Sequence, residues 1–366
     1  MRYLVGVLGA GQLGLMLALE GRRLGLEFRF FSPDPDAPAG KVAELIVADY
    51  DNHEALAHFA DGLDVATYEF ESIPADAVRV VNERVSVFPP VAALETAQDR
   101  AIEKECFERL KIPTAAFAAV DSTAQVRAAV DRIGFPAVLK TRRFGYDGKG
   151  QAVIRVHDDI ASAWVSLRGV PAIVECLVKF SRELSIIAVR GRDGSTGFYP
   201  LVENHHSEGI LRFSVAPAPA VPPALQALAE DYARRVLTDL DYVGVLAIEF
   251  FESDGNLVAN EMAPRVHNTG HWSIEGADTS QFENHLRAVA GMPIGSSGMA
   301  GAVGMVNVIG RDPDVRRLRQ LDNVHVHMYG KAASPRRKLG HITVTADDME
   351  GVRGRVAEVR RLLASV

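Results

Sequence analysis

The chain has 366 residues, of which 48% are hydrophobic and 24% charged, and its formal net charge is −7. The composition is that of a soluble globular protein, the length suggests about two or three domains, and the acidic balance argues against nucleic acid or an anionic membrane as main partner. The cysteines, Cys106 and Cys176, are too few and too far apart for a disulfide framework or a metal knuckle, which favours a reducing, cytoplasmic setting. No apolar run reaches the roughly 18 residues of a membrane span.

Up to about residue 90, short apolar runs alternate with helix-like stretches, the pattern of parallel βαβ units. The predicted strands are YLVGVL, EFRFFS, ELIVAD, DVATYEF and VSVFP. Gly9, Gly11 and Gly14 follow the first strand in G-x-G-x-x-G spacing, and Asp34 or Asp36 lies roughly 20 residues on, where a ribose-binding acid belongs. A nicotinamide dinucleotide site is one hypothesis. The alternative is that the glycines only allow strand and helix to pack closely.

One amphipathic helix is predicted for residues 93–112, ALETAQDRAIEKECFERLKI, because its apolar residues have helical spacing and a proline follows. Beyond it, a helix around DDIASAWVSLRG and the strands FPAVLKT, GQAVIRV and AIVECLV predict a small α+β unit. The loop of residues 141–151, TRRFGYDGKGQ, combines Arg142, Arg143 and Lys149 with three glycines. Glycine backbone can turn its N–H groups toward an anion, so the loop predicts a lid over a polyphosphate, with a solvated hairpin loop as the alternative.

The next segment carries long strands that meet at turn sequences, which predicts a larger, mainly antiparallel sheet. These strands are RELSIIAVRG, TGFYPLVE, VGVLAIEFFES and LVANEMAP. Residues 216–224, APAPAVPPA, are expected to be extended, because closely spaced prolines forbid a helix. From about residue 300, short strands and a final helix, GVRGRVAEVRRLLASV, predict a small C-terminal unit.

Two glutamates interrupt the apolar strands on either side of a turn at residues 254–256. If those three residues form the turn, Ser253 pairs with Leu257, and Glu249 stands opposite Glu261. Directly opposed residues have Cβ atoms about 5 Å apart, where two carboxylates repel unless a cation lies between them. Magnesium shared with nucleotide phosphates would satisfy this arrangement, since it prefers one or two carboxylates plus phosphate oxygens. Alternatively, one glutamate faces solvent or an arginine.

Hydrogen-bond donors follow the second of these strands. Arg265, His267 and Asn268 suit an anionic or hydroxyl-rich substrate, whereas a structural role is expected for His271. A basic segment near the C-terminus predicts either a phosphate site or an exposed basic loop, and its members are Lys331, Arg336, Arg337 and Lys338.

The order of motifs GAGQLG, YEFE, QDR, RRFGYDGKGQ, NEMAPRVHNTGHW and RRKLGH resembles the N5-carboxyaminoimidazole ribonucleotide synthetase family of the ATP-grasp superfamily over nearly the whole chain. The resemblance implies an α/β and α+β architecture: an ATP-grasp fold with an N-terminal Rossmann-like (biotin-carboxylase-like) domain and a small C-terminal β-rich unit. Four units are expected: a Rossmann-like domain (1–92), a small ATP-grasp subdomain with the lid (93–175), a large ATP-grasp subdomain with metal and substrate residues (176–298) and a C-terminal unit (299–366).

The implied activity is ATP-driven carboxylation of 5-aminoimidazole ribonucleotide by bicarbonate, through carboxyphosphate. Magnesium, with two ions expected, would be held by Glu249 and Glu261. Residues implied to bind ATP are Arg100, Lys140, Gly145, Tyr146, Asp147, Gly148, Lys149, Gly150, Gln151, Glu175, Cys176, Leu177, Val178, Glu183, His206, Asn260 and Glu261. Residues implied to bind the ribonucleotide are Glu71, Tyr146, Asp147, Arg265, His267, Asn268, Lys331 and Arg337. The implied catalytic residues are Asp147, Lys149 and Arg265, with Asp147 removing the amine proton.

The resemblance also implies a homodimer, small-molecule substrates, and no nucleic-acid or membrane partner. It assigns the loop from Gly9 to Gly14 to the ribonucleotide side of the cleft rather than to a dinucleotide. Ser334 and Arg336 depart from the family pattern, which makes the phosphate assignment to Lys331 and Arg337 less secure. Phe144 in the lid also departs from it, where a small residue is common. The alternatives are another ATP-grasp carboxylate–amine ligase acting on a different small substrate, or a nucleotide sensor without turnover.

Overall fold

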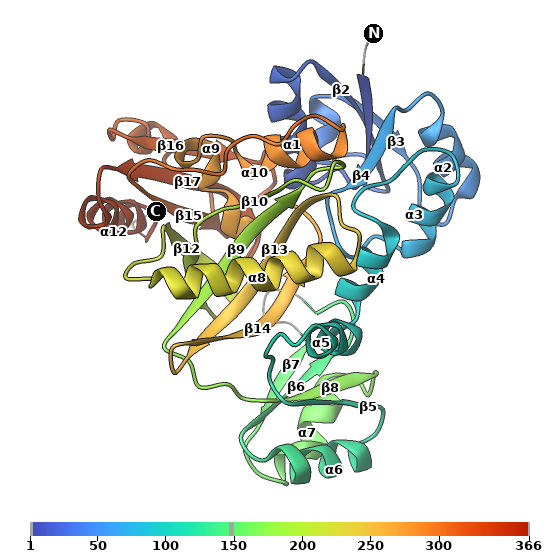
Figure 1. Cartoon of the computed structure of the whole chain (residues 1–366), viewed down its shortest axis with the longest axis vertical. Coiled ribbons are helices and arrows are strands. Elements are labelled where there is room, and N and C mark those ends of the chain that lie inside the picture. The colour runs from blue at the N-terminus through green and yellow to red at the C-terminus, as the bar shows by residue number, and fades with distance from the viewer. Residues whose placement is uncertain (1–2, 146–149, 365–366) are drawn as a thin grey trace.

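The computed structural model describes residues 3–145 and 150–364. The N-terminal part is a four-stranded parallel sheet of order β3-β2-β1-β4 (Figure 1), which confirms the predicted βαβ pattern. Its strands are β1 (Tyr3–Leu8), β2 (Leu26–Ser32), β3 (Glu44–Val47) and β4 (Val65–Tyr68), and its helices are α1 (Gln12–Arg23), η1 (Pro38–Lys41), α2 (His53–Ala60) and α3 (Ala75–Asn82). The predicted strand VSVFP is wrong, because Val87 forms only an isolated bridge to Ala66 before two prolines, which offer no N–H to a ladder.

The predicted single helix over residues 93–112 is also wrong. Two helices occupy this stretch, α4 (Val91–Gln98) and α5 (Arg100–Arg109). Between them Asp99 is extended, with φ −125° and ψ 111°, and its side chain accepts a hydrogen bond from Ala101 N. The break has a local cause, since an aspartate carboxylate offers backbone N–H groups an alternative partner and is favoured as a helix N-cap.

The small subdomain lies at the bottom of Figure 1 and has a four-stranded antiparallel sheet of order β5-β8-β6-β7. Its strands are β5 (Phe117–Val120), β6 (Ala137–Thr141), β7 (Gln151–Ile154) and β8 (Ala172–Cys176). Two helices share one apolar core with this sheet, α6 (Thr123–Ile133) and α7 (Asp159–Ser166). The sequence reasoning found three of these strands and α7 but missed β5 and α6. The lid loop joins β6 to β7, and its residues 146–149 lie outside the described residues.

A nine-stranded sheet forms the body of the protein, with the order β14-β13-β9-β11-β12-β15-β17-β16, and β10 pairs with β9. Every pairing in it is antiparallel, as the sequence predicted. The strands are β9 (Arg182–Arg190), β10 (Thr196–Phe198), β11 (Val202–Ser207), β12 (Ile210–Ala216), β13 (Gly244–Ser253), β14 (Asn256–Ala263), β15 (Ala302–Ile309), β16 (Val324–Met328) and β17 (Lys338–Ala346). The C-terminal strands therefore extend the same sheet. The predicted domain boundaries stay a prediction.

Two details of this region differ from prediction. TGFYPLVE is not one strand, because Pro200 separates β10 from β11. The proline-rich segment is not extended throughout, because Ala220 has a φ of 52° within a turn and Pro223 begins helix α8 (Pro223–Asp239), where a missing N–H costs nothing in the first turn. The remaining helices are η2 (Asn268–Gly270), α9 (Ser273–Gly276), α10 (Gln281–Val289), α11 (Val315–Leu318) and α12 (Met349–Ala364).

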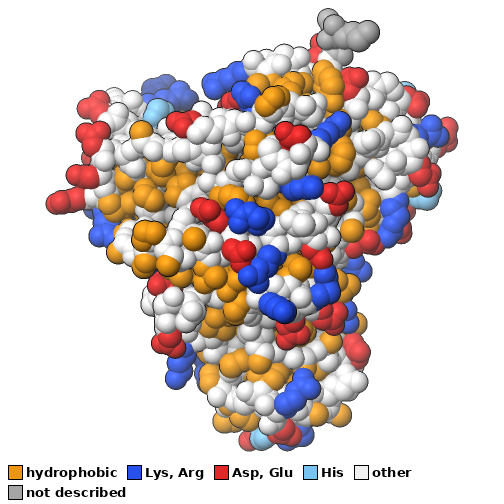
Figure 2. All heavy atoms as spheres, in the orientation of Figure 1, with side chains coloured by type: hydrophobic (Ala, Val, Ile, Leu, Met, Phe, Trp, Pro, Cys, Tyr) orange, Lys and Arg blue, Asp and Glu red, His pale blue; other side chains and the backbone are white. Residues whose placement is uncertain are grey.

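The large sheet is covered on both faces. Helix α8 crosses the face toward the viewer in Figure 1, where its apolar side packs on β9, β13 and β14. The other face of these strands shares a core with α10 and with the N-terminal sheet, including Val5, Val245 and Phe282. Acidic and basic side chains are interspersed on the surface seen in Figure 2 rather than gathered into one patch. None of the helices in the described part of the chain has the length and hydrophobicity to cross a membrane.

Candidate active site

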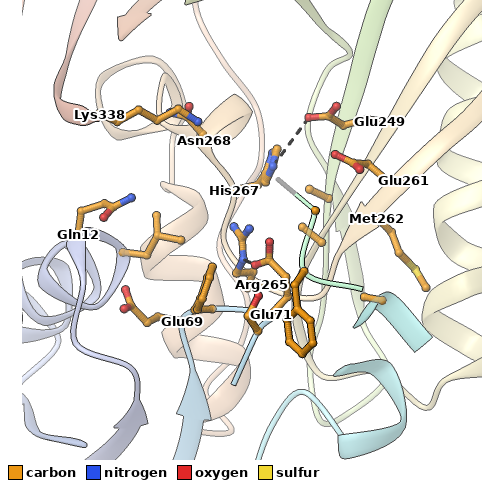
Figure 3. A pocket seen from close by; sticks show the side chains of 18 of the residues that line it. Gln12, Glu69, Glu71, Glu249, Glu261, Met262, Arg265, His267, Asn268 and Lys338 are labelled. Atoms are coloured by element: carbon orange, nitrogen blue, oxygen red, sulfur yellow. Dashed lines mark hydrogen bonds and ion pairs between the residues drawn. The ribbon is translucent and has the colours of Figure 1, made fainter. Parts of the chain in front are cut away.

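A cavity of about 710 Å³ opens where the N-terminal sheet, the β13–β14 hairpin and the segment before β17 meet. All the described residues expected to bind the ribonucleotide line it, namely Glu71, Arg265, His267, Asn268, Lys331 and Arg337. In Figure 3, Glu249 and Glu261 lie on one side and Gln12 and Glu69 on the other, with His267 and Arg265 between them. The expected site residues Tyr146, Asp147, Gly148 and Lys149 lie outside the described residues.

The predicted opposition of Glu249 and Glu261 is confirmed, but the predicted three-residue turn is wrong. Ser253 pairs with Asn256 across a two-residue turn in which Asp254 and Gly255 both have positive φ, 50° and 75°. An irregularity in register next to Glu249 then restores the pairing with Glu261. This bulge also decides the face. Phe250 and its partner Ala259 pack toward α8, so strict alternation would send Glu261 there too, whereas one extra residue turns it to the side of Glu249.

The two carboxylates form an electrostatically strained pair. Burial, and then the charge of Glu261, raise the pKa of Glu249 to about 7. The same two causes raise the pKa of Glu103 to about 8. The described residues contain no group of three or more side chains that could hold a metal alone. Magnesium takes one or two carboxylates plus phosphate oxygens and water, so the pair fits a cation shared with a nucleotide.

Arg265 and Glu71 form a partly buried ion pair beside this acid pair, with Arg265 Nε donating to Glu71 Oε2. Burial opposes both charges, but each partner outweighs it, so the pKa of Glu71 is lowered and that of Arg265 is raised. Burial, and then Arg265, hold the pKa of His267 well below its usual value, so its ring is neutral. Thr269 contacts His267 Nδ1 with its Oγ1 at 2.9 Å and with its N–H at 3.4 Å; because a backbone N–H can only donate, Nδ1 is assigned as the acceptor and the ring proton to Nε2, which lies 3.8 Å from Glu249 Oε1. The cavity thus presents a fixed cation and a neutral donor.

Comparison with known proteins identifies the family. The chain matches the models of the ribonucleotide synthetase preATP-grasp domain over residues 2–98, the ATP-grasp domain over 105–282, and the phosphoribosylaminoimidazole carboxylase C-terminal domain over 303–355. N5-carboxyaminoimidazole ribonucleotide synthase of Pseudomonas aeruginosa is 53% identical over 359 residues, which cover 98% of this chain and 99% of the relative. The chain belongs to the N5-carboxyaminoimidazole ribonucleotide synthase family.

Solved structures agree with this identification and with the expected ATP-grasp fold. The synthetase of Thermus thermophilus has a TM-score of 0.94 at 50% identity, with 98% of each chain covered. The synthase of Aspergillus clavatus, solved in complex with ADP and 5-aminoimidazole ribonucleotide, has a TM-score of 0.93 at 30% identity, covering 100% of this chain and 99% of the other.

The residues that this synthase family is expected to use for ATP do not all lie in the cavity. Arg100, Gly145 and Glu261 line it. Arg100 connects the lid to the acid pair, since its Nη2 donates to Gly145 O at 3.0 Å and lies 3.7 Å from Glu261 Oε2. The other described ones lie outside its lining, on the small sheet or its lid and hinge (Lys140, Gly150, Gln151, Glu175, Cys176, Leu177, Val178) or on the large sheet (Glu183, His206, Asn260).

Two of these residues are ion-paired within the small sheet. Lys140 on β6 donates to Glu175 on β8 at 2.9 Å, and Lys104 lies 3.8 Å from the same oxygen. Burial opposes ionisation of Glu175, but Lys140 and Lys104 outweigh it and hold its pKa below the usual value. On the large sheet His206 Nδ1 contacts Glu183; burial lowers the pKa of His206, but this partner and Glu249 outweigh it and raise the pKa. Among the described residues, the predicted ATP cations Arg100, Lys140 and His206 thus each have an acidic neighbour.

The glycine-rich loop from Gly9 to Gly14 holds a carboxylate of the same chain. Gly11 N and Gly14 N donate to the two oxygens of Glu69, which follows β4 and is 7% exposed. A Cβ at Gly11 would lie 2.8 Å from Glu69 Oε1, so a larger residue at this position would displace the carboxylate. The dinucleotide hypothesis is therefore wrong, because the amides that would bind a pyrophosphate are taken. Sequence reasoning quoted YEFE but assigned a role only to its second acid, Glu71, although both acids line the cavity.

Gln281, at the start of α10, is a second residue that sequence reasoning missed. Its Oε1 accepts from His267 N at 2.9 Å and its Nε2 donates to His267 O at 2.7 Å. The side chain is fully buried, so it acts as an internal amide partner for the backbone of the substrate loop. His271, which Gln281 also contacts, is buried as expected of a structural histidine. Nothing in the local sequence distinguishes Gln281 from any other polar residue that opens a helix.

Proposed function

We propose that the chain is an ATP-dependent ligase that carboxylates the exocyclic amine of 5-aminoimidazole ribonucleotide with bicarbonate, giving N5-carboxyaminoimidazole ribonucleotide, ADP and phosphate in de novo purine biosynthesis. One observation carries the proposal: an acid pair suited to a nucleotide-bound cation shares a cavity of about 710 Å³ with Lys331 and Arg337, which suit a sugar phosphate. Arg265 and His267 lie between these two ends and suit the reacting groups.

The reaction needs activation because bicarbonate is a poor electrophile. A bicarbonate oxygen attacks the γ-phosphorus of ATP, the bond to ADP breaks, and carboxyphosphate forms. The amine nitrogen then attacks the carboxyphosphate carbon, phosphate leaves, and a base removes the proton from nitrogen. Asp147 is the proposed base, and Asp147→Asn should then lose turnover while ATP still binds.

The described side chains supply position and charge. Glu249 and Glu261 would hold magnesium, which neutralises the nucleotide phosphates when bound. Arg265 is a buried cation at which negative charge on the carboxyl group would be stabilised. Burial keeps the His267 ring neutral, and its Nε2–H can donate a hydrogen bond to a substrate oxygen or nitrogen. Because Nε2 carries the proton, it would not act as a magnesium ligand. Closure of the lid around Arg100 and Gly145 would exclude water from carboxyphosphate.

The assembly and setting belong to the same proposal: a homodimer in the cytoplasm, with small-molecule partners and no nucleic acid. Sedimentation of the purified chain at two concentrations tests the dimer. The alternative substrates remain outcomes of the activity test, since Ser334 and Arg336, which depart from the family pattern, both line the cavity.

The deciding experiment measures phosphate release from Mg-ATP and bicarbonate with and without 5-aminoimidazole ribonucleotide. We expect strong stimulation in the wild type, loss of it in Glu261→Gln, and retention in the matched control Glu230→Gln, a half-buried position of α8 that does not line the cavity. ATP binding without stimulation would leave an ATP-grasp ligase of another amine, or a sensor, in place of the proposed reaction.

A further inference from the structure

Asn268, which lines the cavity, exchanges two hydrogen bonds with Asn307, which does not. Asn268 Nδ2 donates to Asn307 Oδ1 at 3.0 Å, and Asn307 Nδ2 donates to Asn268 Oδ1 at 2.7 Å. Asn307 belongs to β15 of the C-terminal part and is 5% exposed. Its Nδ2 makes a third hydrogen bond, to Leu211 O of β12 at 2.9 Å. The carbonyl of Leu211, the buried amide of Asn307 and the amide of Asn268 in the cavity thus form one hydrogen-bond network.

This hydrogen-bond network determines which way the amide of Asn268 points. A carbonyl oxygen can only accept, so Leu211 O requires the nitrogen of Asn307, which leaves Asn307 Oδ1 to face Asn268. Asn268 must then turn its own nitrogen toward that oxygen. An amide carries two N–H donors and an oxygen with two lone pairs. One donor and one lone pair of Asn268 therefore stay for a ligand, in a fixed direction.

Asn307 is not needed to hold the path of the substrate loop. Gln281 already bonds both the N–H and the C=O of His267, and Ser273 Oγ donates to Gly270 O at 2.6 Å. A change at Asn307 therefore acts on the Asn268 side chain rather than on the loop backbone.

We infer that Asn307 is a positioning residue for the ribonucleotide, acting through Asn268 by fixing the direction of its amide toward the cavity. The inference rests on the proposed function, because Asn268 is a substrate contact only in that proposal. It adds a strand of the C-terminal sheet to substrate recognition at a position that does not touch the cavity.

A double-mutant cycle tests this role, with Asn307→Ala, Asn268→Ala and the double variant compared in steady-state phosphate release. Asn307→Ala should raise the KM for 5-aminoimidazole ribonucleotide about tenfold, the worth of one well-directed hydrogen bond, and leave the KM for Mg-ATP within about twofold. In the Asn268→Ala background it should add nothing. If Asn307→Ala folds poorly, Asn307→Leu keeps about the same volume, offers neither a donor nor an acceptor, and should give the same pattern.

Asn284→Ala is the matched control. Asn284 is a fully buried asparagine on α10 whose amide bonds Tyr199 and Gly295, away from the cavity, so its loss should lower stability without changing the ribonucleotide KM. An unchanged KM in Asn307→Ala, or an equal rise in both Asn268 backgrounds, overturns the inference while the wild type still responds to the ribonucleotide. A wild type without that response overturns the proposed function, and this role of Asn307 with it.

Discussion

Glu261→Gln is expected to stabilise the ligand-free protein above pH 7 while it removes Mg-ATP-dependent turnover. Glu249 is 15% exposed and directly opposite Glu261, and burial and then Glu261 raise its pKa to about 7. The pair is therefore arranged for a cation and strained without one. Replacing one carboxylate by an amide removes the repulsion but keeps the shape of the hairpin.

The sign and size follow from proton linkage. Because the folded-state pKa of Glu249 lies above its usual 4.5, the folded protein keeps a proton that the unfolded chain releases. The contribution of Glu249 to the free energy of unfolding is fully present below pH 4.5 and is lost as the pH rises through 7. The loss is about 3 kcal/mol, because each tenfold change in proton affinity is worth roughly 1.4 kcal/mol. Burial is the larger cause and stays in the variant, so relief from Glu261 is about 1 kcal/mol. The lost contact with Arg100, 3.7 Å long and with Glu261 46% exposed, offsets about 0.3 kcal/mol.

Urea unfolding in EDTA at pH 5.5 and pH 8 measures this effect. Between the two pH values we expect the wild type to lose about 1 kcal/mol more than Glu261→Gln. In a parallel series without EDTA, Mg-ATP should stabilise the wild type but not Glu261→Gln. Glu230→Gln, which removes an acid from α8 and keeps an amide oxygen to accept from Gln226, should behave as wild type. Equal pH slopes for wild type and Glu261→Gln, or a variant less stable at pH 8, would refute the reasoning.

Three further perturbations test other parts of the structure. Gln281→Leu leaves the N–H and C=O of His267 without partners, so the free energy of unfolding should fall by about 2–4 kcal/mol and the ribonucleotide KM should rise. Unchanged values in urea unfolding and in steady-state kinetics would contradict this role of Gln281. Burial lowers the pKa of His285 to about 4, so its contribution to the free energy of unfolding is present above pH 6.5 and is lost as the pH falls toward 4, by up to about 3 kcal/mol. Urea unfolding at pH 7 and pH 4.5 should show a smaller loss of stability in His285→Gln than in the wild type, and an equal loss would count against this role of His285. Asp99→Ala removes the N-cap of α5 and the two hydrogen bonds from Arg142, so the free energy of unfolding should fall by about 2–3 kcal/mol. Asp99→Asn keeps the cap and should be about 1 kcal/mol more stable than Asp99→Ala. Equal stability of the two variants in thermal unfolding would argue against the cap.

Much of the architecture could be predicted because its signals are local. Alternating apolar runs predicted the parallel N-terminal sheet, and turn sequences between long strands predicted the antiparallel body. The failures were local competitions of another kind. At Asp99 a side-chain cap overrode helical periodicity, and at Pro200 a missing N–H divided a strand. The motifs YEFE, NEMAPRVHNTGHW and RRKLGH predicted residues that the fold does bring to one cavity.

The face of Glu261 could be predicted only by compensating errors. The sequence reasoning assumed a three-residue turn and an unbroken ladder, and the structure has a shorter turn and a bulge. The two differences cancel in register. Bulge position depends on how the strand packs against α8 on one side and the cavity on the other, which the turn residues do not encode.

By itself, then, the sequence determined the order of the units, the antiparallel body and the residue types of the site, because periodicity, turn chemistry and motif spacing act over short stretches of chain. Tertiary structure alone decided that Glu69 fills the glycine loop from 58 residues away, that Gln281 holds His267, and that Asn307 directs Asn268. These contacts satisfy buried polar groups, and a buried donor finds its partner wherever the packed chain brings one within reach. No local pattern records that partner, because the requirement arises only once water has been excluded.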